Sequence, residues 1–123
     1  MLEDPKRWRL LRDSKKGKFS YLIGVDNWSI ELQKSEFDSL YLLLIRINKQ
    51  LLDIQNELME EETINLELEQ LPWYIQLEGK KNEWSLRFIF ESQDQTRSFE
   101  MYWPIPTAQN LFYEIKKMWE SMD

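Results

Sequence analysis

The chain has 123 residues, of which 42% are hydrophobic and 31% are charged, and its formal net charge is −6. A chain of this length and apolar content can bury a core of its own, so we expect residues 1–123 to form a single folded domain. It contains neither cysteine nor histidine. This excludes disulfides, thiolate chemistry, Cys-ligated zinc and the commonest general base.

Glycine is too scarce for the loops that bind phosphates or dinucleotides, since the chain has only Gly17, Gly24 and Gly79. No serine lies in a Gly-X-Ser-X-Gly motif. We therefore expect no enzymatic activity and no cofactor. No apolar run approaches the ~18 residues that a membrane helix needs, and the N-terminal residues lack the apolar core of a signal peptide. We expect a cytoplasmic protein that does not associate with membranes.

Alternation of apolar and polar residues predicts three strands in the first part of the chain. These strands fall at residues 7–12, 18–24 and 28–32. In the first of them, Trp8 and Leu10 share one face, while Arg7 and Arg9 share the other. Short polar turns separate the strands, so we expect an antiparallel meander with Trp8 in the core.

A long helix is predicted from residue 36 to about residue 59. Ser35 can cap its first turn, and Asp38, three residues further on, can complete a capping box. The middle of the helix, residues 40–45, is apolar on nearly all sides. Such a helix is covered on two faces, by a sheet and by a second cover. The second cover is either another layer of the same chain or a second copy of the chain in a homodimer.

Four further strands follow, again recognised by alternation. They fall at residues 64–69, 73–79, 84–91 and 97–103. Thr107 can then cap a final helix with one apolar face. The order of three strands, a helix, four strands and a helix predicts an α+β fold built from antiparallel meanders.

Five segments of the chain carry a resemblance to known proteins, and they are WRLLRD, LIGVDNWSIEL, EFDSLYLLL, ELMEEETINLELE and WSLRFIF. In this order and spacing they resemble a small cyanobacterial protein family of unknown function, over nearly the whole chain. The order of strands and helices also resembles the Whirly-type fold that binds single-stranded DNA. That resemblance implies a nucleic-acid-binding or transcription-related role by analogy of fold.

One part of the Whirly pattern can be compared residue by residue. The family carries a Lys-Gly-Lys-Ala-Ala-Leu run on an early strand. Lys16, Gly17 and Lys18 match its first three places, and residues 19–21 depart from the other three. The same three residues are also typical of a hairpin turn.

A basic stretch, residues 6–19, holds seven Lys or Arg residues and one Asp in a chain that is acidic overall. Binding of a single strand needs a cationic track for phosphates and aromatic faces for bases. The candidate contacts for single-stranded nucleic acid or for a protein partner are therefore Arg7, Arg9, Lys15, Lys16 and Lys18.

An acidic run extends from Asp53 to Glu78, and no Lys or Arg occurs between residues 50 and 79. The candidate acidic partner surface within it consists of Glu60, Glu61, Glu62, Glu67 and Glu69. The first three of these glutamates oppose the dipole at the end of the predicted long helix. Either that helix ends earlier, or a basic protein, a divalent cation or the chain's own basic stretch compensates them; a solvated face is the simplest alternative.

These observations predict a non-enzymatic interaction protein that binds a macromolecular partner through its charged surface. The alternative is a Whirly-type regulator that binds single-stranded nucleic acid with the basic N-terminal hairpin.

Overall fold

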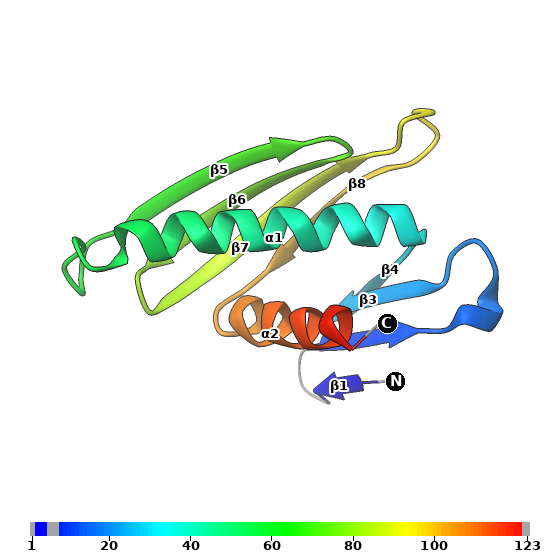
Figure 1. Ribbon diagram of the computed structural model, residues 1–123, viewed down its shortest axis with the longest axis horizontal. Coiled ribbons are helices and arrows are strands. Elements are labelled where there is room, and N and C mark those ends of the chain that lie inside the picture. Colours follow the sequence, from blue (N-terminus) through cyan, green and yellow to red (C-terminus); the bar gives the residue numbers. More distant parts are fainter. Residues whose placement is uncertain (1, 5–7, 122–123) are drawn as a thin grey trace.

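The computed structural model describes residues 2–4 and 8–121, which form two antiparallel sheets and two α-helices (Figure 1). The strands of the first sheet are β1 (Leu2–Asp4), β2 (Trp8–Arg12), β3 (Tyr21–Val25) and β4 (Trp28–Leu32). Each strand pairs with the next one along the chain. The predicted meander is therefore present, and the short strand β1 is added at its edge. A short 3-10 helix, η1 (Ser14–Lys16), lies in the turn between β2 and β3.

The second sheet is also a meander, and its strands again pair in chain order. They are β5 (Ile64–Gln70), β6 (Trp73–Lys80), β7 (Glu83–Glu91) and β8 (Ser98–Trp103). A helix follows each sheet: α1 (Lys34–Gln55) follows the first, and α2 (Thr107–Glu120) follows the second. The α+β fold predicted from the sequence is thus confirmed.

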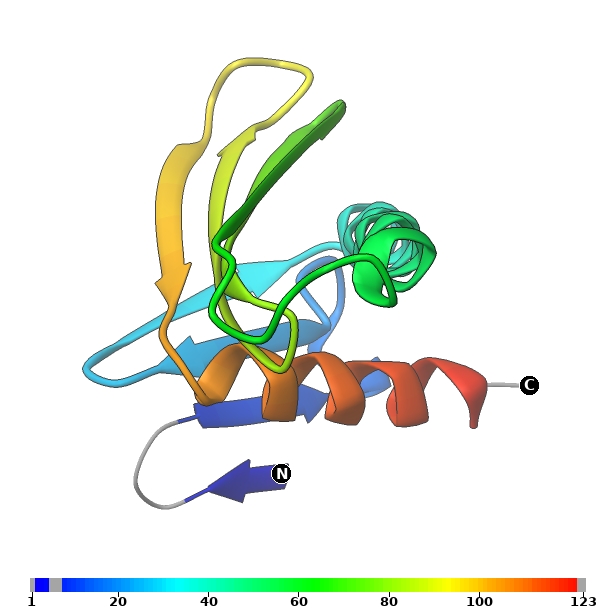
Figure 2. The ribbon, with the colours of Figure 1, turned by 90° about the vertical axis from the view of Figure 1, so that its left-hand side faces the viewer.

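The two helices cover different parts of the sheets. Helix α1 packs on β5 and β6, whereas α2 packs on β7 and also on β2 of the first sheet. Figure 2 shows α2 running along the first sheet, with the strands of the second sheet rising away from it and α1 seen end-on beside them. Helix α2 therefore joins the two sheets. Within the described residues, no helix has the length and apolarity that crossing a bilayer requires.

Helix α1 begins two residues earlier than predicted. Gln33, not Ser35, is the N-cap, and its backbone N–H donates to a carboxylate oxygen of Glu36 at 2.9 Å. Asp38 does not serve the cap, because it accepts from the ammonium of Lys34 at 2.9 Å, one helical turn back. The predicted pairing of Ser35 with Asp38 is wrong, since Glu36 is the carboxylate placed to reach the free backbone amide.

The last residue of α1 is Gln55, four residues before the predicted end. Glu60, Glu61 and Glu62 lie beyond it in the connection to β5, so they do not oppose the dipole of the last turn. The N-cap of α2 is Pro106, which makes the prediction of a Thr107 cap wrong. The hydroxyl of Thr107 is buried without a hydrogen-bond partner in the described structure.

The core is rich in aromatic side chains. Trp8 is buried, as its alternation with Arg7 and Arg9 predicted. The ring of Tyr21 in β3 stacks on Phe37 of α1 with 4.2 Å between centroids. In addition to sheet contacts, α1 packs against α2, where Tyr41 stacks on Trp119 at 4.5 Å. The second cover predicted for α1 thus includes a layer of the same chain, and the homodimer stays a prediction.

Candidate functional site

The basic stretch contains one arginine that the fold itself uses. The guanidinium of Arg9 donates to the backbone carbonyls of Asp26 at 3.1 Å and Trp28 at 2.8 Å, and so holds the turn between β3 and β4. It lies across Gly24, where an added Cβ would be 2.5 Å from a guanidinium nitrogen. Arg9 therefore has a structural role, and Arg7 lies outside the described residues.

Three lysines of the stretch, Lys15, Lys16 and Lys18, lie in the turn between β2 and β3 and are exposed, and Lys6 lies outside the described residues. The ammonium of Lys16 pairs with the carboxylate of Glu31 on β4 at 2.7 Å. The ammonium of Lys18 lies 5.9 Å from the centroid of the Phe19 ring. Lys15 donates its backbone N–H to Asp13. Residues 16–18, which match the start of the Lys-Gly-Lys-Ala-Ala-Leu run of the Whirly family, therefore lie in a turn before β3. In the Whirly family that run lies on a strand.

A groove with a volume of about 820 Å³ lies beside this turn, where β2 ends, α1 begins and α2 ends. Its basic residues are Arg12, Lys18 and Lys34, and no described residue lining it is acidic. Its aromatic lining residues are Tyr21, whose side chain is buried in the core, and Trp119, which is half-buried. The hydrogen bond from Lys34 to Asp38 raises the pKa of this lysine above its ordinary value.

The acidic residues fall into two groups. Glu60, Glu61 and Glu62 lie in the connection between α1 and β5, and the basic turn lies at the opposite end of the molecule (Figure 1). The 22 residues of α1 between them span about 33 Å at 1.5 Å per residue. No ion pair of the described structure includes these glutamates. The described lysines of the basic stretch therefore do not compensate them.

Glu67 and Glu69 belong to a different surface, the outer face of the second sheet. One row across that face runs Glu67, Gln76, Arg87 and Tyr102, and the next runs Glu69, Tyr74, Ile89 and Glu100. Glu78 and Glu91 lie on the same face by alternation. We call this surface the acidic sheet face. By the same alternation Lys80 and Glu83, which are opposite each other on β6 and β7, also lie on it. It carries six carboxylates and two cations, and Tyr74, Ile89 and Tyr102 form its centre.

Two contacts organise the centre of the acidic sheet face. Partial burial raises the pKa of Tyr74, and a hydrogen bond to Glu67 raises it further. The guanidinium of Arg87 lies 5.8 Å from the centroid of the Tyr102 ring. Among the described residues, no cluster of three or more acidic side chains is arranged to hold a metal ion, on this face or elsewhere.

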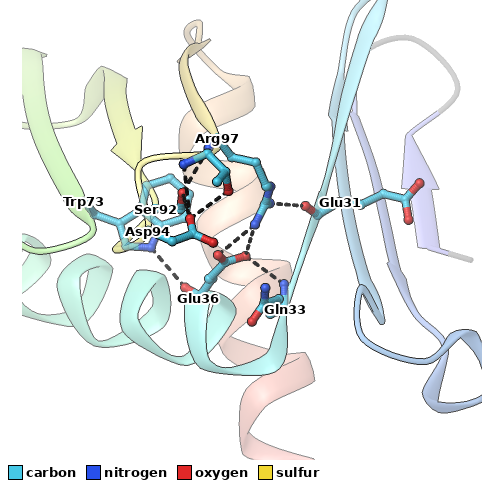
Figure 3. Close-up of polar contacts among 8 residues, drawn as sticks. Glu31, Gln33, Glu36, Trp73, Ser92, Asp94 and Arg97 are labelled. Atoms are coloured by element: carbon cyan, nitrogen blue, oxygen red, sulfur yellow. Dashed lines mark hydrogen bonds and ion pairs between the residues drawn. The ribbon is translucent and has the colours of Figure 1, made fainter.

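The most elaborate polar centre was not predicted (Figure 3). The guanidinium of Arg97 donates to both carboxylate oxygens of Glu36, at 3.0 and 2.8 Å, and to the backbone carbonyl of Glu31 at 2.8 Å. It also packs on the rings of Phe19 and Phe90, at 4.7 and 5.3 Å from their centroids. Both sheets and α1 meet at this centre, so we call the pair of Arg97 and Glu36 the interlayer ion pair.

The turn before β8 positions Arg97. Its backbone N–H donates to the hydroxyl of Ser92 at 3.0 Å, and that hydroxyl donates to Asp94 at 2.7 Å. Asp94 also accepts from the side chain and the backbone of Thr96. These hydrogen bonds lower the pKa of Asp94 to about 2. No sequence signal indicated the ion pair, because 61 residues separate its partners.

Comparison with known proteins agrees with the predicted resemblance to a cyanobacterial family of unknown function, and does not confirm the resemblance to the Whirly-type fold. The chain matches a family described as a domain of unknown function (DUF1818) over residues 3–118. It is also similar to the crystal structure of a protein of unknown function from the cyanobacterium Prochlorococcus sp. NATL2A, described as a member of the DUF155 family. The two are 36% identical with a TM-score of 0.88, over 97% of this chain and 99% of that chain. None of the curated proteins matches. The chain therefore belongs to the DUF1818 family of domains of unknown function.

Proposed function

We propose that this domain is a non-enzymatic interaction protein that binds a basic protein segment through its acidic sheet face. The observation that carries the proposal is the imbalance of charge on that face. Its six carboxylates take part in no ion pair of the described structure, and Lys80 and Arg87 are the two cations among them; the carboxylates are those of Glu67, Glu69, Glu78, Glu83, Glu91 and Glu100. Such a surface attracts Lys- or Arg-rich partners and speeds their encounter.

The centre of the face supports the same function. Ile89 is 41% exposed and Tyr102 is 47% exposed, although both stand in the middle of strands. Tyrosine is among the residues enriched at the centres of interfaces, where an apolar patch is surrounded by a polar rim. A partner that combines basic side chains with an apolar or aromatic residue fits this arrangement.

The test is a titration of a fluorescent Lys- and Arg-rich peptide that contains one aromatic residue, at low and high salt, with a Glu-rich peptide as the opposite probe. We expect the basic peptide alone to bind, and to bind more weakly at high salt. Glu67→Lys, Glu69→Lys and Glu100→Lys together should abolish binding.

The matched control is the triple variant Glu60→Lys, Glu61→Lys and Glu62→Lys. It changes the net charge by the same amount but leaves the acidic sheet face intact. Equal loss of binding in both triple variants would mean that only net charge matters, and would overturn the proposal. So would failure of the basic peptide to bind at low salt.

A second candidate function is binding of single-stranded nucleic acid by the basic N-terminal hairpin. The observation that favours it is the exposure of Lys15, Lys16 and Lys18 next to the groove that holds Arg12. Labelled single-stranded DNA should bind, and the affinity should fall steeply with salt. Changing the three lysines to Glu should abolish binding, and absence of binding by the unchanged protein at low salt would reject this function.

A further inference from the structure

The groove beside the β2–β3 turn concentrates positive charge in an acidic protein. Arg12, Lys18 and Lys34 reach it from the end of β2, from the turn and from the first residue of α1. The chain has 22 acidic residues, yet none of the described lining residues is acidic. Arg12 and Lys18 form no ion pair with any described residue. Two cations are thus available to an anion that enters the groove.

These two cations suit a phosphate group. The guanidinium of Arg12 can donate two parallel hydrogen bonds to phosphate oxygens, and the ammonium of Lys18 adds a mobile point charge. Ser14 and Ser20 also line the groove and offer hydroxyl donors. One helix begins here and another ends here, so their opposite end charges largely cancel and the side chains set the local field.

The aromatic part of the lining is held rigidly. Trp119 is stacked on Tyr41 with 14° between the ring planes, and Tyr21 is stacked on Phe37 with 10°. Rings fixed in this way lose little freedom when a ligand binds, which favours binding. Tyr21 is only 3% exposed, so the half-buried Trp119 provides most of the apolar surface for a flat ring. The ammonium of Lys34 lies 5.9 Å from the centroid of the Trp119 ring, so cation and ring are adjacent.

The volume of the groove favours a ligand larger than a free phosphate ion. Its volume of about 820 Å³ is within the range of roughly 300–1,000 Å³ found for sites of small ligands. A free phosphate ion would leave the aromatic surface uncovered, whereas a ligand with both a phosphate and a ring would contact both parts of the lining.

We infer that this groove binds a phosphorylated ligand that carries a flat ring, of the mononucleotide class. The inference does not depend on the acidic sheet face. A free nucleotide and the phosphorylated end of a nucleic-acid single strand present the same chemistry. The inference rests on the second candidate function only if the ligand is such an end.

The test follows backbone amide signals by NMR while AMP, inorganic phosphate or adenosine is added to the full chain. We expect AMP to bind roughly tenfold more tightly than either of its parts, since it alone engages both parts of the lining. The shifted signals should be those of the groove, with Gly17, Ser20 and Ser121 among them. Absence of binding, or shifts scattered over the surface, would overturn the inference.

Two variants decide whether the groove itself is responsible. Arg12→Gln with Lys18→Gln should weaken AMP binding roughly tenfold or more, because both charge-assisted contacts are lost. Arg46→Gln with Lys49→Gln is the matched control, because it removes the same two kinds of cation from exposed positions of α1 that do not line the groove. Equal weakening by this control would reject a defined site. Unchanged thermal unfolding midpoints would show that the variants are folded.

An oligonucleotide with a 5′-phosphate separates this inference from the hairpin function. Binding of AMP without binding of the oligonucleotide would support a free ligand and reject the hairpin function. Binding of the oligonucleotide without binding of AMP would reject the mononucleotide groove and leave the hairpin function intact.

Discussion

Two cations approach the same aromatic ring, and they have opposite roles. Arg97 lies 4.7 Å from the centroid of Phe19, and Lys18 lies 5.9 Å from it. Arg97 is held by both carboxylate oxygens of Glu36, which is buried, whereas Lys18 is exposed and faces the groove. The density of charge along the sequence thus does not show which cations are structural. The isolated arginine joins the layers, and Lys18 from the dense basic stretch forms no ion pair with a described residue.

The difference follows from the chemistry of the two side chains. A guanidinium is planar and weakly hydrated, so Arg97 can lie between two aromatic rings while it donates to a carboxylate and to a carbonyl. An ammonium is compact and strongly hydrated, so Lys18 remains in water. Burial of Glu36 then makes the interlayer ion pair essential, because a buried carboxylate without its partner is costly.

The largest effect is expected from Arg97→Gln. This change leaves Glu36 buried without its cation, and we expect the free energy of unfolding to fall by about 3 kcal/mol. Urea denaturation followed by tryptophan fluorescence measures it. Arg87→Gln on the exposed face of β7 is the matched control and should cost less than about 0.5 kcal/mol.

A double-mutant cycle sharpens this prediction. Glu36→Gln keeps the acceptor of the helix cap and removes the charge, so the variant with both Arg97→Gln and Glu36→Gln should be more stable than the sum of the single losses implies. Additive losses would show that the two side chains act independently, which would contradict the interlayer ion pair.

Gly24→Ala extends the comparison to Arg9, the structural cation of the basic stretch. The new methyl group displaces the guanidinium and breaks its two bonds to backbone carbonyls, which should cost about 1–2 kcal/mol. The same change in an Arg9→Ala background should be nearly neutral, as urea denaturation of the four proteins would show. A loss of the same size in both backgrounds would mean that Arg9 does not explain the glycine.

Asp94 links the interlayer ion pair to pH. Its pKa is about 2 in the folded protein against an ordinary 3.8, so its charged form stabilises the fold. That stabilisation is complete above about pH 4 and is lost as the pH falls through 2. Asp94→Asn should therefore lower the thermal unfolding midpoint at pH 5, and the gap to the unchanged protein should narrow towards pH 2. A constant gap would refute this role for the charge of Asp94.

The smallest effect is expected from Lys16→Gln. The pair with Glu31 is short, at 2.7 Å, but both side chains are more than one-third exposed. Water and salt screen such pairs, so the free energy of unfolding should change by no more than about 0.5 kcal/mol. A loss of stability as large as that of Arg97→Gln would contradict the distinction between Arg97, whose ion pair joins the layers, and the exposed lysines.

The strands could be predicted from the sequence because alternation with a period of two depends only on local burial. Trp8 and Leu10 were placed in the core on this basis, and both are buried. The start of α1 could not be predicted, since Ser35 with Asp38 fits a capping pattern as well as the residues that form the cap. Glu36 serves the cap and also binds Arg97, and only the folded chain shows this second role.

The candidate sites were predictable only in part. The basic and acidic stretches were visible in the sequence, and Glu67 and Glu69 do share one sheet face. The partners that complete each surface come from distant segments: Glu100 joins the acidic sheet face from β8, and Lys34 and Trp119 join the groove from the two helices. Which residues meet in this way depends on how the layers pack, and no local pattern encodes that.

The meander connectivity also bears on how the chain reaches its fold. Every strand pairs with its neighbour in the sequence, so each hairpin closes a short loop and forms early. We expect the joining of the layers to come later, since it brings together residues as far apart as Arg97 and Glu36. During synthesis α1 emerges before β5 and β6, and the apolar side that it turns to them stays uncovered until they follow. A chain stopped after residue 63 is therefore expected to aggregate, while the complete chain folds.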